Sequence, residues 1–173
     1  MTRYTSRSVI LHWLSGGLLI FLLVTGTFVL SNMPNTVEKL GSLKIHMILG
    51  ILTTVVSVMR IWMISRAPKP EALSMSPFRA KMMKANHIAI YVVIIAIGVS
   101  GVSGFVLAQS ASLGQMIFFG LEKELYGSFK DFGVGIVHGL LTKVLLFLIV
   151  MHVVGVVSYA IKSKNNIIKR MWF

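Results

Sequence analysis

The stretch GVGIVHGLLTKVLLFLIVMHVVGVVSYAI, residues 133–161, decides the fold of this chain. It is an apolar run with one charged residue, Lys143, and it contains two histidines, His138 and His152. A run of about 20 apolar residues is enough to cross a bilayer as a helix. In such a helix, a separation of fourteen residues corresponds to about 21 Å of rise and nearly the same face. The two imidazoles are therefore expected on one side of a helix, at two depths in a membrane.

Three more runs, each without Asp, Glu, Lys or Arg, precede this one at residues 8–30, 45–59 and 87–109. The composition, with 55% hydrophobic residues, 13% charged residues and a mean hydropathy of +0.83, is that of a membrane protein. Only helices and closed barrels satisfy their backbone hydrogen bonds in lipid, and the period-two alternation of a barrel is absent. The sequence predicts an all-α fold, a transmembrane four-helix bundle forming one domain over residues 1–173, with helices at about 8–30, 42–64, 86–109 and 133–161.

Several classes of site and segment are excluded. The chain has no cysteine, which rules out disulfides, thiolate-ligated haem, c-type haem attachment and iron–sulfur clusters. The first apolar run is longer than the core of a signal peptide, and no convincing small-residue cleavage pattern follows it. We therefore expect the first run to be a membrane helix.

The basic residues predict the orientation. Twelve of them lie at the ends of the chain and around the second connection, against four in the other two connections. Because Lys and Arg are enriched in cytoplasmic segments, both termini are expected in the cytoplasm. The net charge of +12 is then mostly topogenic, and no soluble basic face exists for a nucleic-acid partner.

Depth sorts the five histidines into two layers. His46 and His138 fall at the outer ends of their helices, so they are expected to pair. His12, His87 and His152 fall at the inner, cytoplasmic ends. His152 is the expected shared partner there, with either His12 or His87 opposite, and spacing does not choose between them. Ionisable residues within membrane segments are rare and usually functional, and two layers of paired histidines suit two stacked haems.

Other readings of the histidines fit less well. A zinc site needs ligands at one level, often with Cys or carboxylate. A proton pump usually has intramembrane Asp or Glu, and all five acidic residues are predicted in loops. Glycines follow the histidines closely, and a stripe of Gly98, Gly101 and Gly104 runs along the third helix. Such a stripe is explained by close helix packing or by contact with a flat cofactor.

The ordered motifs of the chain resemble those of the bacterial cytochrome b-561 family. Relatives of that family include the cytochrome b subunits of formate dehydrogenases and nickel–iron hydrogenases. The resemblance covers almost the whole chain and rests on Arg3-Tyr4-Thr5-Ser6-Arg7, His12-Trp13-Leu14, Lys44-Ile45-His46 with Gly50, Arg60, Asn86-His87 with Tyr91, His138, His152, Asn166 and Arg170.

The resemblance implies two haems b in a bacterial inner membrane. The iron ligands would be His12 with His152 for one haem and His46 with His138 for the other. That leaves His87 free, in a region similar to a quinone pocket. Tyr159 lies about two helical turns beyond His152 and is expected to be the second polar group for ubiquinone.

Basic residues near each layer are expected to pair with haem propionates, with Arg60 or Arg66 on the inside and Lys44 on the outside. Lys143 is expected to extend outward toward the lipid headgroups or to donate to a propionate. The loop at residues 109–131 mixes aromatic residues with Lys and Glu, which predicts a short amphipathic segment on the outer surface.

Bis-histidine haems have no open position for oxygen chemistry, so the predicted function is electron transfer across the bilayer. Similarity to the family suggests a free-standing superoxide:ubiquinone oxidoreductase, with superoxide oxidised at the periplasmic face. The alternatives are an anchor subunit that passes electrons from a periplasmic dehydrogenase to quinone, and a haem-free structural or transport bundle. The compact chain favours the free-standing enzyme, and the sequence is compatible with a homo-oligomer.

Overall fold

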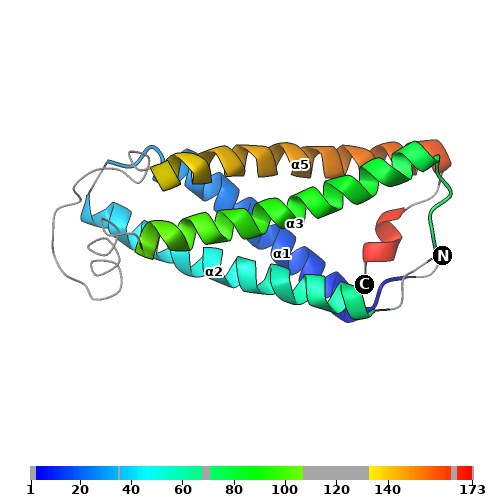
Figure 1. Ribbon diagram of the computed structural model, residues 1–173, viewed down its shortest axis with the longest axis horizontal. Coiled ribbons are helices and arrows are strands. Elements are labelled where there is room, and N and C mark those ends of the chain that lie inside the picture. Colours follow the sequence, from blue (N-terminus) through cyan, green and yellow to red (C-terminus); the bar gives the residue numbers. More distant parts are fainter. Residues whose placement is uncertain (1–2, 35, 68–70, 107–132, 165–166, 173) are drawn as a thin grey trace.

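A computed structural model describes residues 3–34, 36–67, 71–106, 133–164 and 167–172. The described residues form helices joined by non-helical segments and contain no strand, which confirms the all-α prediction (Figure 1). The expected amphipathic segment at residues 109–131 lies outside the described residues. The elements are α1 (Ser6–Val24), its π-helical continuation η1 (Thr25–Leu30), α2 (Val37–Arg66), α3 (Pro77–Val106), α5 (Gly133–Ser163) and the short 3₁₀ helix η3 (Ile167–Met171).

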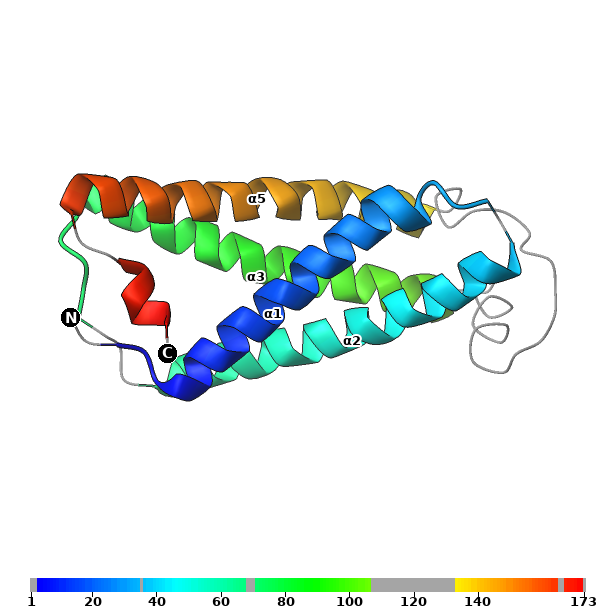
Figure 2. The same cartoon turned by 180° about the vertical axis from the view of Figure 1, so that it is seen from behind.

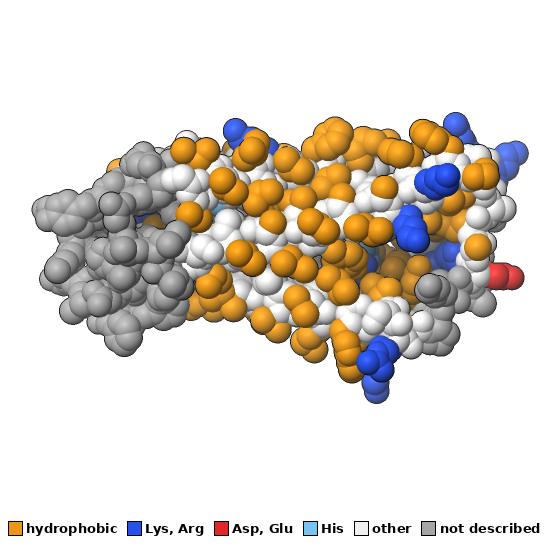
Figure 3. All heavy atoms as spheres, in the orientation of Figure 1, with side chains coloured by type: hydrophobic (Ala, Val, Ile, Leu, Met, Phe, Trp, Pro, Cys, Tyr) orange, Lys and Arg blue, Asp and Glu red, His pale blue; other side chains and the backbone are white. Residues whose placement is uncertain are grey.

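The four long helices are apolar enough to cross a membrane. The candidate spans are Ser6–Leu30, Gly41–Arg66, Pro77–Ser103 and Gly133–Ser163, with lengths of 25, 26, 27 and 31 residues. Many large apolar side chains, such as Phe28, Phe147 and Ile161, are exposed on the outside of the bundle. Figure 3 shows hydrophobic side chains along the visible face and Lys and Arg gathered toward one end. This distribution suits contact with lipid, and the transmembrane four-helix bundle is confirmed.

Helix α3 begins nine residues before its predicted start at residue 86. The cause is the pair Ser76-Pro77: the Ser76 Oγ accepts from the Arg79 backbone nitrogen at 3.4 Å, and Pro77 occupies the first helical position. Helix α2 likewise begins at Val37 instead of 42, with Glu38 in its first turn. The expectation that all acidic residues lie in loops is therefore wrong for Glu38. Hydropathy marks only the lipid-facing part of a helix, and both helices continue beyond it.

Local signals also end the helices. Ala67 follows α2 in an extended conformation, with φ −77° and ψ 148°, because residue 68 is proline and disfavours a helical residue before it. Lys164 follows α5 with φ 53°, in the left-handed region that often ends a helix. The α5 helix therefore extends to Ser163, slightly past the predicted end at 161.

The helices pack mainly as two pairs, α1 with α2 and α3 with α5, and α2 joins the pairs by packing on α3. Figure 2 shows α1 crossing the bundle diagonally in front of α3 and α2. The α2–α3 contact depends on Gly98, because a Cβ atom at this position would lie 2.5 Å from Thr54 Oγ1. Thr54 Oγ1 is held in place by donating to the Gly50 carbonyl at 2.9 Å. Both termini lie at one end of the bundle (Figure 1).

We predict that Gly98→Ala destabilises the protein by about 1–3 kcal/mol, the usual cost of overpacking a tight contact. The measurement is the thermal unfolding midpoint in detergent, followed by circular dichroism. Gly41→Ala is the matched control, since a Cβ atom there has nothing within 4 Å. Equal midpoints for the two variants would show that the α2–α3 contact tolerates a methyl group.

Candidate functional site

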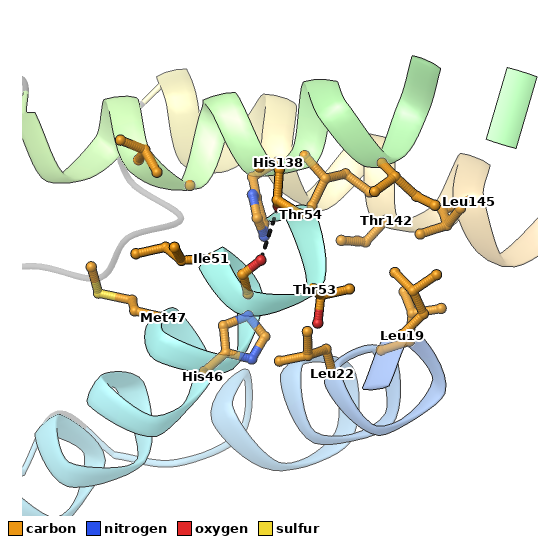
Figure 4. A pocket seen from close by; sticks show the side chains of 17 residues that line it. Leu19, Leu22, His46, Met47, Ile51, Thr53, Thr54, His138, Thr142 and Leu145 are labelled. Atoms are coloured by element: carbon orange, nitrogen blue, oxygen red, sulfur yellow. Dashed lines mark hydrogen bonds between the residues drawn. The ribbon is translucent and has the colours of Figure 1, made fainter. Parts of the chain in front are cut away.

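The two outer histidines lie on opposite walls of one cavity. His46 extends from α2 and His138 from α5, and both rings point into the space between these helices (Figure 4). Apolar side chains from the four long helices line most of the cavity. The lining hydroxyls of Thr53, Thr54 and Thr142 donate to carbonyls of their own helices. The imidazoles are therefore the polar groups of the described lining with capacity to bind a ligand.

Glycines hold the outer rings against the backbone. The chain becomes π-helical at Thr25, and a Cβ atom on Gly26 in η1 would lie 3.1 Å from His46 Cε1. A Cβ atom on Gly101 of α3 would lie 3.5 Å from His138 Cε1. Gly50 lines the cavity with nothing within 4 Å of its Cβ position. Since π-turns are frequent at functional sites, the helical irregularity in η1 also points to this cavity. Within the predicted stripe, Gly98 and Gly101 both line the cavity, where Gly98 packs against Thr54 and Gly101 lies beside His138.

The Nδ1 atoms of the outer histidines have different surroundings. His138 Nδ1 lies 3.0 Å from the Ser100 hydroxyl oxygen, whereas His46 Nδ1 is buried without a hydrogen-bond partner in the described chain. A buried polar atom left unsatisfied costs about 1–3 kcal/mol. Ser100 was not among the predicted site residues. The available signal was its position beside Gly101 in the small-residue stripe.

Three inner histidines come together from α1, α3 and α5. The ring centroid of His152 lies 6.3 Å from that of His12 and 5.0 Å from that of His87. His12 Nδ1 is buried and has no partner among the described residues. His87 Nδ1 lies 2.7 Å from the Met83 carbonyl oxygen. A carbonyl can only accept, so the proton of a neutral His87 is on Nδ1 and its Nε2 presents a lone pair.

Arg60 supplies a partly buried cation to the inner level. Its guanidinium carbon lies 5.6 Å from the centroid of the Tyr91 ring. The guanidinium is also close enough to His12, His87 and His152 to act on them electrostatically. Its Nε is buried without a partner, and no carboxylate pairs with it in the described part of the chain. A cation with a buried, unpartnered nitrogen is stabilised by a nearby anion, so this level is suited to a negative group.

The other predicted site residues lie farther from these contacts. Tyr159 is buried at 5% exposure, and no hydrogen bond joins its hydroxyl to His87 or His152 within the described chain. Tyr91, which contacts Arg60, is the tyrosine that the structure brings to the inner level. Lys44 and Lys143 are both exposed, on α2 and α5 respectively. Their side chains therefore lie outside the helix interfaces.

The C-terminal segment covers the inner end of the bundle. The Trp13 indole donates to the Met171 carbonyl at 2.6 Å, and the Tyr4 backbone nitrogen donates to the Arg170 carbonyl at 3.2 Å. The Arg170 guanidinium donates to the Glu71 carbonyl at 2.6 Å, and Arg170 is only 5% exposed. Trp13 directly follows His12, so the chain end is tied to the helix start that carries an inner histidine. In the sequence alone, Arg170 is only one of the residues that resemble the family's motifs, and its docking contact appears in the folded chain.

Comparison with known proteins gives the same class as this geometry. The prokaryotic cytochrome b561 family model matches residues 3–173, and the chain belongs to this family. A relative from Escherichia coli (strain K12), named cytochrome b561 homolog 2, is 28% identical over 177 residues, covering 98% of this chain and 90% of the relative. No solved structure matches significantly.

Membership makes the protein a membrane b-type cytochrome with a role in electron transfer, and it implies that the chain binds haem b. The residues present fit such a group. The described chain offers partly buried imidazoles, two of them with a buried orphaned Nδ1, an apolar cavity with a glycine wall, and a partly buried guanidinium that lacks an anion. These are the ligands, the walls and the counter-charge that a haem requires.

We predict that Arg170→Ala frees the C-terminal segment. A hydrogen bond from a charged group contributes about 1.5–3 kcal/mol, so local opening of residues 167–171 should become roughly 10- to 100-fold more frequent. Hydrogen exchange followed by mass spectrometry measures this opening. Lys169→Ala is the control, because Lys169 is exposed on the same segment. Unchanged exchange in Arg170→Ala would mean that other contacts hold the segment.

Proposed function

We propose that this protein binds two haems b, one above the other, and passes electrons across the bilayer between a periplasmic one-electron donor and ubiquinone. The outer haem would be ligated by His46 and His138, and the inner haem by His12 and His152. The observation that carries the proposal is the sorting of imidazoles into two levels between the helices, each level with a buried orphaned nitrogen.

The spacing of the inner rings supports His12 as the partner of His152. If one metal ion were held between two imidazoles at metal–nitrogen distances near 2 Å, the ring centroids would lie about 6 Å apart. The centroid separation is 6.3 Å for His12 and His152 and 5.0 Å for His87 and His152, so the second pair leaves less space for an ion. His87 then remains outside the ligand set, as the family resemblance implies.

Arg60 supports a haem at the inner level for a different reason. Haem propionates are anionic, and a partly buried guanidinium without a carboxylate partner in the described residues is suited to hold one. Arg66 is exposed and stacks on Trp62, which leaves Arg60 as the better candidate. Lys44 is proposed as the propionate partner at the outer level, because its long flexible side chain can extend to such a group.

When bound, a haem with two histidine ligands supplies reversible one-electron chemistry without an open coordination position. The protein's own contribution is to hold the imidazoles on α1, α2 and α5, to exclude water with apolar walls, and to balance charge at Arg60. The two histidines of α5 set the vertical separation of the sites, about 21 Å by helical rise. We propose that both termini face the cytoplasm of a bacterial inner membrane, which makes the Arg60 level the inner one.

His87 is proposed to handle a proton for the quinone. Reduction of ubiquinone to ubiquinol takes two electrons and two protons. With Nδ1–H donated to Met83, His87 acts through Nε2, which accepts a proton from water and then donates it to a quinone oxygen. Figure 3 shows the face between α2 and α3 hollowed toward this end, with basic side chains inside, which suits entry of a quinone from the membrane. Tyr159 is proposed as the second polar group.

We predict that the purified protein contains two low-spin b-type haems per chain. His46→Ala and His138→Ala should each lose the same outer haem, and His12→Ala and His152→Ala should each lose the inner one. The pyridine haemochrome assay gives the stoichiometry, and redox titration tells the two haems apart. His87→Ala is the control and should retain both. Loss of a haem in His87→Ala but not in His12→Ala would reverse the inner assignment.

We predict that His87→Ala slows reoxidation of the reduced haems by added ubiquinone by roughly 10²-fold, the usual scale for removal of an acid–base group. Stopped-flow absorbance measures the rate. Lys81→Ala, an exposed change on the same helix, is the matched control. An unchanged rate in His87→Ala would place the quinone elsewhere.

The donor is tested in the same experiment. Superoxide generated enzymatically should reduce the haems of the wild type and of His87→Ala equally, because the donor acts at the outer level. If superoxide reduces neither protein, the chain is instead the anchor subunit of a periplasmic dehydrogenase.

A further inference from the structure

Ser100 makes a side-chain hydrogen bond to the outer histidine His138. Its hydroxyl oxygen lies 3.0 Å from His138 Nδ1 and 2.9 Å from the carbonyl oxygen of Ile97, one turn earlier in α3. Ser100 is 8% exposed, so water does not compete freely for these contacts. The Ile97 carbonyl, the Ser100 hydroxyl and the His138 imidazole thus form a short hydrogen-bonded chain between α3 and α5.

The chemistry of these groups decides where the protons are. The Ile97 carbonyl only accepts, so the Ser100 hydroxyl donates its hydrogen to Ile97. The Ser100 oxygen is then an acceptor toward His138. The neutral imidazole therefore carries its proton on Nδ1, and Nε2 keeps the lone pair.

A close contact with the α3 backbone also holds the His138 ring in this orientation. A Cβ atom on Gly101 would lie 3.5 Å from Cε1 of His138, so the ring rests close to α3 on the side next to Ser100. His138 and Gly101 both line the outer cavity. The opposite outer histidine, His46, also has a glycine beside it, Gly26, but its Nδ1 has no hydrogen-bond partner in the described residues. Of the two outer imidazoles, His138 is therefore the one oriented by a side-chain hydrogen bond from a neighbouring helix.

We infer that Ser100 is a positioning residue for His138: it holds the proton on Nδ1, directs Nε2 to the iron of the outer haem, and lowers the midpoint potential of that haem. The inference rests on the proposed function, in which His138 is an axial ligand. A hydrogen-bonded N–H makes an imidazole a more basic ligand, and a more basic ligand favours ferric over ferrous iron.

The test compares Ser100→Ala with Ser100→Thr by redox titration of the purified cytochrome, with haem content measured alongside. In Ser100→Ala we expect the preference of the outer site for ferric over ferrous haem to fall threefold to tenfold. This raises its midpoint potential by roughly 28–59 mV, at 59 mV per tenfold change for one electron. The inner haem, in the same molecule, should not shift. Ser100→Thr keeps a hydroxyl that can bond the preceding turn, and should stay near the wild-type value.

Ser103→Ala, one turn further along α3, is the matched control. Loss of the outer haem in Ser100→Ala with retention in Ser100→Thr also supports the inference, since second-sphere partners affect metal affinity by about 10- to 100-fold. The inference is overturned if the outer potential is unchanged in Ser100→Ala, if Ser103→Ala shifts it equally, or if Ser100→Thr behaves like Ser100→Ala. A His138→Ala protein that keeps both haems would overturn the ligand assignment itself, which separates failure of the proposed function from failure of this inference.

Discussion

The structure depends on one constraint: polar nitrogens placed inside a thin apolar bundle need partners. Buried nitrogens of His12, His46 and Arg60 have no hydrogen-bond partner among the described residues, and each would cost about 1–3 kcal/mol if left so. Lipid offers no compensation, because the helices present mainly apolar side chains outward. The packing of the bundle is therefore best understood around groups that bind the haem b implied by the family.

The pairing of the helices serves this need. The closest packing joins α1 with α2 and α3 with α5. The proposed ligand pairs join helices across these two units, with α5 opposite α2 at the outer level and opposite α1 at the inner level. Space for a flat group thus lies between the units, while contacts such as Gly98 with Thr54 keep α2 close to α3.

The two levels differ in their polar surroundings, and this difference matches the proposed tasks. The outer cavity is mainly apolar, and its imidazole His138 is oriented by the Ser100 hydroxyl. The inner level contains Arg60, Tyr91 and His87, and the docked C-terminal segment covers its end. Among the described residues, the side chains able to balance charge and exchange protons lie at the inner level, whereas the outer cavity is lined mainly by apolar side chains.

The sequence by itself determined that this is a membrane protein with four helices and histidines at two depths. Hydropathy and helical rise depend only on consecutive residues, so both can be read from the sequence. It missed the early starts of α2 and α3, since local signals such as Ser76-Pro77 begin a helix outside its apolar part. Spacing also left the inner pairing of His152 open. Only the tertiary structure brought Tyr91 under Arg60, Ser100 to His138 and Arg170 to Glu71. These contacts join residues on different segments, and their formation depends on how helices rotate and cross, which no periodicity along one segment encodes.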